Sequence, residues 1–127
     1  MKKIILIILL LICIGCSSNK PSYQKINNDK LYQVIEEIDN YVIIDVRTFV
    51  EYNNGHIENA INIPVDGINE DTVRNLDTDD YIIVYCQSGN RSKQAALELL
   101  DLGFINVFDY GSIDNYDGDI IKKETND

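Results

Sequence analysis

Two short apolar runs constrain the fold of this 127-residue chain more than any other feature. Residues 41–46 and 81–85 are rich in β-branched and aromatic side chains, which occupy consecutive positions rather than alternate ones. Strands that are apolar on both sides are typical of a parallel sheet with helices over both faces. The two runs therefore predict an α/β domain built around a mostly parallel central sheet.

The segments beside these runs show the period of amphipathic helices. Residues 27–38 begin with two asparagines that can cap a helix, and then place apolar side chains at i, i+3, i+4 and i+7. Residues 91–102 gather alanines and leucines on one face, and Gly103 follows as a typical end signal. Shorter elements are also expected: strands at 23–26, 60–63 and 107–109, a helix at 48–53, and a polar helix at 69–76.

The N-terminus reads as a targeting signal. Lys2 and Lys3 precede an unbroken run of eleven apolar residues, 4–14. That run is too short for a membrane-spanning helix, which needs ~20 apolar residues. The segment resembles the signal of a bacterial lipoprotein, because Ile14 and Gly15 precede Cys16, although Cys13 stands where such signals usually carry leucine.

This resemblance implies that Cys16 becomes the lipidated N-terminus of a membrane-anchored, extracytoplasmic protein. A simple secretory signal or an uncleaved anchor is the alternative, and either would also place the domain outside the cytoplasm. The expected organisation is a signal peptide at 1–15, a polar tether at 16–22, a domain at 23–117 and an acidic tail at 118–127.

Cysteine usage points to a single reactive thiol. Cys13 would leave with the signal and Cys16 would be lipidated, so Cys86 would remain without an internal partner. Cys86 and the only histidine, His56, are too few for a metal cluster, and no metal is expected. The net charge of −10 argues against nucleic acid as a partner, because such binding depends on an excess of Lys and Arg.

Cys86 directly follows the second apolar run and opens a short loop into the helix predicted at 91–102. Amide groups at a helix N-terminus stabilise an anion, and a nearby guanidinium such as Arg91 adds to this, so a thiolate is favoured here. Gly89 permits the tight turn that the loop needs. The alternative is that Cys86 is a small buried hydrophobic residue, which would leave Gly89 and Arg91 unexplained.

At these residues the chain resembles the single-domain sulfurtransferases of the rhodanese family. Cys86 matches the catalytic cysteine of that family, and the loop 86–91 has the six residues typical of sulfurtransferases. Asp45, Val46 and Arg47 match an Asp-Val-Arg motif, and residues 55–57 with 60–64 match a second signature. The resemblance covers residues 23–117.

The resemblance implies a three-layer α/β sandwich with a mostly parallel central sheet, and a sulfur carried as a persulfide on Cys86. A small sulfur donor would supply the sulfur, a thiol or cyanide would accept it, and no cofactor is implied. Asp45 and Arg47 would brace the site, and His56 would order a turn. The substrate loop would consist of Gln87, Ser88, Gly89, Asn90 and Arg91.

Two departures from the family pattern are visible. Asn59 stands where the family usually has glycine, and residues 109–112 replace a Gly-Gly ending, with Tyr116 as the remaining aromatic residue. A second class of function also stays open: a non-enzymatic redox-sensing or partner-binding module of the same fold at the cell surface. Whether the thiol accepts sulfur from a donor separates these two hypotheses.

Overall fold

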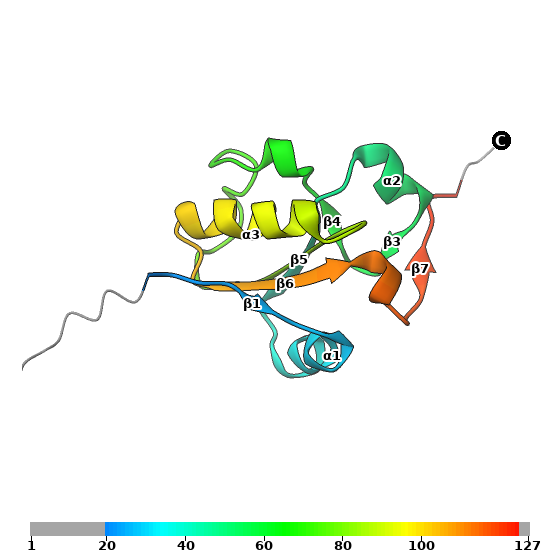
Figure 1. Cartoon of the computed structure of the whole chain (residues 1–127), viewed down its shortest axis with the longest axis horizontal. Helices are drawn as coiled ribbons and strands as arrows, with labels where there is room; N and C mark the ends of the chain where they lie inside the picture. The colour runs from blue at the N-terminus through cyan, green and yellow to red at the C-terminus, as the bar shows by residue number, and fades with distance from the viewer. Residues whose placement is uncertain (1–19, 125–127) are drawn as a thin grey trace, which may run out of the picture.

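The computed structural model describes residues 20–124, which form a central sheet with helices on both faces (Figure 1). Helix α1 (Asn28–Glu37) covers one face, whereas α3 (Asn90–Asp101) and the short α2 (Phe49–Asn54) lie on the other. Asn27 caps α1 by accepting a hydrogen bond from the amide of Lys30. The expected three-layer α/β architecture is confirmed.

The central sheet has five strands in the order β1-β6-β5-β2-β4, and every neighbouring pair is parallel. The two apolar runs of the sequence are β2 and β5, which lie side by side in its middle. Because the strands run in one direction, their carboxyl ends meet at one edge, where ligands bind in open α/β sheets. The strands are β1 (Gln24–Lys25), β2 (Tyr41–Asp45), β4 (Ile61–Asn62), β5 (Tyr81–Cys86) and β6 (Asn106–Ser112).

Both faces of the central strands are buried, which explains their consecutive apolar residues. Ile44 and Val84 pack in one core cluster with Leu99 of α3. Ile43 and Ile83 point the other way, into the cluster that includes residues of α1. Side chains alternate across a strand, so a strand between two helical layers needs an apolar residue at almost every position.

The prediction of a polar helix at residues 69–76 is wrong. A short 3-10 helix forms earlier, at Val65–Gly67, and residues 69–76 form a series of turns. Asn69 Oδ1 accepts hydrogen bonds from the amides of Asp71 and Thr72, and the Thr72 hydroxyl donates to the carbonyl of Gly67. Such side chains compete with helical hydrogen bonds for the backbone, which favours turns over a helix.

The last strand of the central sheet is longer than the predicted 107–109. Strand β6 continues to Ser112, and a register shift between Val84 and Tyr85 lets Ser112 pair with Cys86. A β-bulge of this kind re-aims the residues beyond it. The longer strand therefore carries the chain from the core to the segment that follows Cys86.

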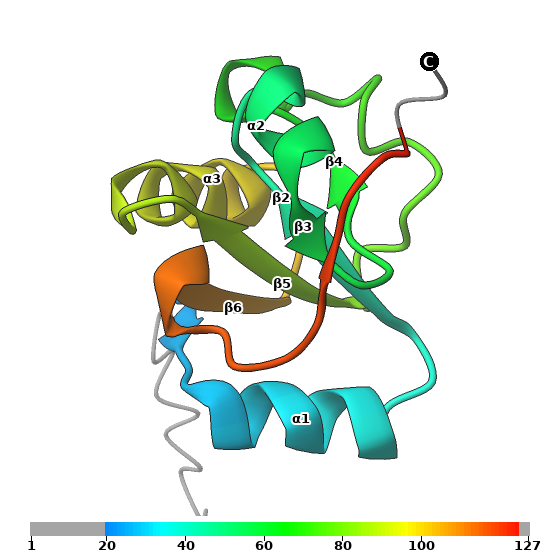
Figure 2. The ribbon, with the colours of Figure 1, turned by 90° about the vertical axis from the view of Figure 1, so that its right-hand side faces the viewer.

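A second, two-stranded sheet was not predicted. Strand β7 (Ile120–Ile121), in the tail, pairs antiparallel with β3 (His56–Ile57), as Figure 2 shows. Gly55 approaches the tail closely: its φ is +150°, and a Cβ placed there would lie 2.7 Å from Cγ2 of Ile120. Residues 118–124 therefore lie against the domain rather than beyond it.

The predicted signal peptide and most of the tether, including Cys16, lie outside the described residues. From residue 20 to residue 124, no helix has the length and apolar character that crossing a membrane would require.

Candidate active site

Cys86 is the last residue of the central strand β5, and its side chain is buried. The chain then turns sharply at Gly89, whose φ of +97° is favourable only for glycine. The backbone N–H of Gly89 donates a hydrogen bond to the Cys86 sulfur at 3.0 Å. The hydroxyl of Ser92 donates to the carbonyl of Gly89 at 3.0 Å, which holds the turn against the first turn of α3.

This geometry favours a negative charge on the sulfur. Gly89 is the N-cap of α3, so the Cys86 sulfur lies at the positive end of the helix dipole. The first turn of α3 contains no acidic residue that would oppose it. Of the other loop residues, Ser88 and Asn90 are exposed, and Gln87 is half-buried.

Arg91 extends from α3 toward α2 rather than remaining unpaired. Its Nη1 and Nη2 atoms each donate to one carboxylate oxygen of Glu51, at 2.9 Å. These hydrogen bonds raise the pKa of Arg91 and lower the pKa of Glu51 to about 2. The negative charge of a Cys86 thiolate further raises the pKa of Arg91, so this guanidinium lies within electrostatic reach of the sulfur.

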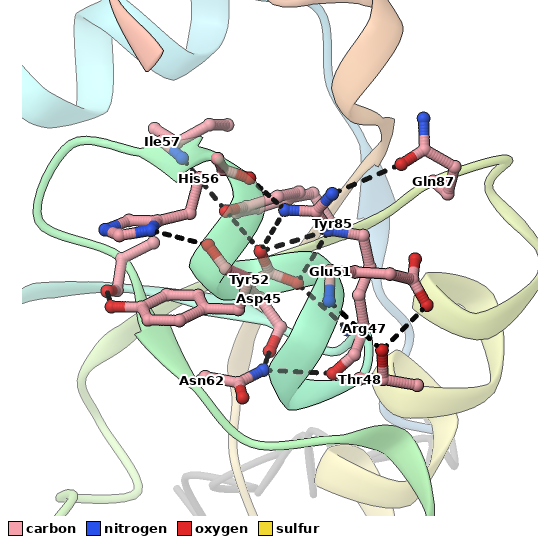
Figure 3. A network of polar contacts seen from close by, with 12 residues as sticks. Asp45, Arg47, Thr48, Glu51, Tyr52, His56, Ile57, Asn62, Tyr85 and Gln87 are labelled. Carbon is pink, nitrogen blue, oxygen red and sulfur yellow. Dashed lines mark hydrogen bonds and ion pairs between the residues drawn. The ribbon is translucent and has the colours of Figure 1, made fainter. Parts of the chain in front are cut away.

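Asp45 and Arg47 form a buried ion pair next to Gln87 of the loop (Figure 3). The closest approach of their side chains is 2.7 Å, from Arg47 Nη2 to Asp45 Oδ2, and Arg47 Nε donates to the same carboxylate. Burial alone would lower the pKa of Arg47, but the hydrogen bonds and charge of Asp45 raise it overall. Arg47 also donates to the carbonyl of Gly55 at 2.6 Å and to Oε1 of Gln87 at 3.2 Å. The ion pair therefore links Gln87 of the loop to the backbone at Gly55.

Tyr85 is a site residue that the sequence analysis missed. Its buried hydroxyl donates to Asp45 at 2.7 Å and accepts from the amide of Ile57 at 3.0 Å. Burial is the main reason that the pKa of Tyr85 is raised. A tyrosine inside an aliphatic strand was the available signal, because a buried hydroxyl needs a partner.

The end of β6 and the 3-10 helix Ile113–Asn115 contact the loop from a third side. The Ser112 hydroxyl donates to the carbonyl of Gln87, and Gln87 Nε2 donates to Asp114 Oδ1 at 3.0 Å. In the sequence, Ser112 stood out only as a departure from the family pattern, and Asp114 did not stand out. Neither residue had a sequence pattern that linked it to the loop.

Three other residues singled out from the sequence lie away from the sulfur contacts. His56 stacks on Tyr52, with ring centroids 3.8 Å apart, and its Nδ1 lies 2.9 Å from the Tyr52 carbonyl. Tyr116 packs near Tyr110 in the cluster on the α1 side of the sheet. Asn59 adopts a φ of +65°, a left-handed conformation that asparagine tolerates better than most residues.

The carboxylates of Asp77, Asp79 and Asp80 lie close enough together to share an ion. They precede β5, at the opposite end of that strand from Cys86, and two of the three are exposed. They therefore belong to a different edge of the sheet from the loop.

Three solved structures are similar to this chain over most of its length. A protein from Bacillus halodurans matches with a TM-score of 0.71 and 31% identity, over 80% of this chain and 77% of that one. A rhodanese with anions from E. coli matches with a TM-score of 0.61 and 31% identity, over 65% and 99%. A rhodanese-related protein from Thermoplasma volcanium matches with a TM-score of 0.64 and 31% identity, over 80% and 100%.

A curated relative is the tRNA uridine(34) hydroxylase of Yersinia enterocolitica, which is 35% identical over 96 residues. The match covers 72% of this chain but only 27% of the hydroxylase, so the chain spans about a quarter of that relative. The family model of the Rhodanese-like domain matches residues 27–119. With the parallel sheet and the cysteine loop already in place, this match shows that the chain belongs to the rhodanese-like domain family.

Proposed function

We propose that this protein is a sulfurtransferase in which Cys86 carries a sulfane sulfur as a persulfide and passes it to a thiol or cyanide. The observation that carries the proposal is the 3.0 Å hydrogen bond from the Gly89 amide to the Cys86 sulfur, at the start of α3. A persulfide ends in an anionic sulfur, and amide groups at a helix N-terminus stabilise such a charge. Membership of the rhodanese-like family supports the same chemistry.

The reaction needs two displacements. The Cys86 thiolate attacks the sulfur to be transferred, and the bond between that sulfur and the rest of the donor breaks: a sulfur–sulfur bond in thiosulfate or polysulfide, a carbon–sulfur bond in mercaptopyruvate. The electron pair of that bond leaves with the rest of the donor, as sulfite, a shorter polysulfide or the enolate of pyruvate. The acceptor then attacks the terminal sulfur of the persulfide, which returns Cys86 as a thiolate. Neither step consumes an external oxidant or reductant.

The name of the hydroxylase relative says that it acts on tRNA. We do not propose tRNA as a substrate of the present chain. The net charge of −10 argues against a polyanion as substrate, because binding depends on Lys and Arg groups that neutralise phosphates. Sulfur transfer to a small or protein thiol carries no such requirement.

The test is sulfur transfer to cyanide, measured as thiocyanate, with thiosulfate, mercaptopyruvate and polysulfide as donors. We expect turnover with at least one donor and none after Cys86→Ser, which keeps the size of the residue but removes the thiolate. Thr72→Ala, in the turns away from the loop, serves as a control and should keep the activity. If no donor supports turnover while Cys86 still reacts with oxidants, a non-enzymatic redox module explains the site better.

We further propose that the protein is an extracytoplasmic lipoprotein anchored through Cys16. The support is the sequence itself: Lys2 and Lys3, the apolar run 4–14, and Gly15 before Cys16. Lipidation of a cysteine adds acyl chains that hold a protein at a membrane surface. Expression in a bacterial host should give a membrane-bound protein whose intact mass starts at an acylated Cys16. Cys16→Ala should release it from the membrane, and an identical distribution of both forms would contradict the proposal.

A further inference from the structure

The two guanidinium groups beside the Cys86 loop are each paired with a carboxylate. Both terminal nitrogens of Arg91 donate hydrogen bonds to Glu51, and Arg47 forms a buried ion pair with Asp45. Each guanidinium is therefore already paired with a carboxylate before any substrate arrives. A paired cation attracts an incoming anion much less than an isolated one does, because the two fields largely cancel beyond a few ångströms.

A third carboxylate, that of Asp114, contacts the loop and forms no ion pair in the described part of the chain. Asp114 accepts a hydrogen bond from Gln87 Nε2 at 3.0 Å. The other end of the Gln87 amide is occupied by Arg47. In the described part of the chain, no lysine side chain makes a hydrogen bond or ion pair with residues 86–91. Three carboxylates thus accompany two guanidinium groups, before the thiolate is counted.

This balance matters because sulfur donors differ in charge next to the sulfur that they transfer. Thiosulfate carries two negative charges. The part that leaves after its outer sulfur is transferred is sulfite, which also carries two. An alkyl persulfide carries at most one negative charge, and its leaving group is a thiol or thiolate. In both cases Cys86 attacks the outer sulfur and the donor's sulfur–sulfur bond breaks, so the chemistry at the cysteine is the same.

From these contacts we infer that the site selects a donor of low charge, an alkyl persulfide, over dianionic thiosulfate. Glu51 and Asp114 are the residues that set this preference, by neutralising Arg91 and by adding a negative charge at Gln87. The inference rests on the sulfur transfer proposed above and names the class of donor for that same site.

The experiment measures single-turnover formation of the Cys86 persulfide, by rapid quenching, alkylation and mass spectrometry, so that no acceptor complicates the rates. The donors are thiosulfate and 2-hydroxyethyl persulfide, which has no charged group apart from its sulfur. We expect the persulfide to react at least ~10-fold faster at equal concentration, since a dianion meets more repulsion than a monoanion.

Two substitutions test the origin of the preference. Asp114→Asn and Glu51→Gln each remove one negative charge and keep a similar shape, so each should raise the rate with thiosulfate relative to the persulfide by about 3-fold or more. Glu36→Gln removes the same charge from an exposed position of α1, on the opposite face of the sheet, and should leave the ratio as in the wild type. Thermal unfolding of each variant checks that the fold is kept.

The outcomes separate the two proposals. Equal rates with both donors in the wild type, or ratios that shift no more than in Glu36→Gln, would overturn the donor preference and leave sulfur transfer standing. If neither donor modifies Cys86 in any form of the protein, the sulfurtransferase proposal fails instead.

Discussion

Glu51 holds Arg91 through two parallel hydrogen bonds of 2.9 Å, which join α2 to the first turn of α3 beside the Cys86 loop. About a third of each side chain is exposed, 33% for Arg91 and 32% for Glu51, so the pair is at the rim of the site rather than in its core. Its bidentate geometry fixes the plane of the guanidinium. Arg91 is therefore a positioned charge near the sulfur.

Replacing Arg91 by alanine should make the Cys86 thiolate less stable and slow sulfur transfer. We expect alkylation of Cys86 at neutral pH to slow, and transfer to slow by ~10²-fold or less if the loop amides supply most of the stabilisation. Alkylation and transfer rates of both forms at the same pH measure this. Arg74→Ala, which removes a positive charge from an exposed turn, is the matched control. Unchanged alkylation and transfer rates would exclude Arg91 from the site.

The contribution of the Glu51–Arg91 pair to the free energy of unfolding should decrease at acid pH. Hydrogen bonds from Arg91 lower the pKa of Glu51 from 4.5 to about 2. Because the pKa is lower in the folded state, the stabilisation is complete above the unfolded pKa and is lost as the pH falls toward 2. Urea unfolding of wild type and Glu51→Gln should differ by about 1 kcal/mol or less at pH 6, and the difference should shrink toward pH 2. A difference that stays constant with pH would show that the charge of Glu51 is not responsible.

With a donor but no acceptor, the Cys86 persulfide should form once and then persist. Cys86 is the free cysteine of the described chain, so no second thiol in that region can resolve the persulfide. Mass spectrometry of the peptide that contains Cys86 should show the addition of one sulfur, ~32 Da. Addition of a thiol should then restore the original mass, and a sulfur that maps to another residue would contradict the assignment.

The protein should not hydrolyse phosphate esters. In the six-residue loop 86–91 the Gly89 amide lies 3.0 Å from the Cys86 sulfur, which leaves space for one small terminal atom, whereas a phosphoryl group needs room for three oxygens around the attacked phosphorus. We expect release of p-nitrophenol from its phosphate ester to match the Cys86→Ser background. Hydrolysis that clearly depends on Cys86 would disprove this argument from loop size.

The tail should stabilise the domain through its contact with Gly55. An alanine Cβ at this position would lie 2.7 Å from Cγ2 of Ile120, and the φ of +150° is itself unfavourable for alanine. Gly55→Ala should therefore lower the free energy of unfolding by about 1–3 kcal/mol. Gly67→Ala is the matched control, because an alanine Cβ there would meet no other part of the chain within 4 Å and the φ is not positive. Equal unfolding curves for the two variants would show that the tail contact carries no stability.

Local patterns in the sequence were sufficient to predict the main elements. The apolar runs became β2 and β5, because a strand covered on both faces must be apolar at consecutive positions. The helix at 91–102 became α3, because its period of apolar residues matches one buried face. The polar segment 69–76 was predicted wrongly, because its Asn and Thr side chains bond to the backbone and compete with a helix.

The sequence by itself determined the local shape of the loop, since Gly89 lies three residues after Cys86 and adopts the positive φ that brings its amide to the Cys86 sulfur. Only the tertiary structure decided what the loop touches. Glu51 and Arg91 are 40 residues apart, as are Asp45 and Tyr85, and β7 reaches β3 from the far end of the chain. Such contacts arise where packed elements converge, and a pairing between distant side chains leaves no periodic signal in either segment.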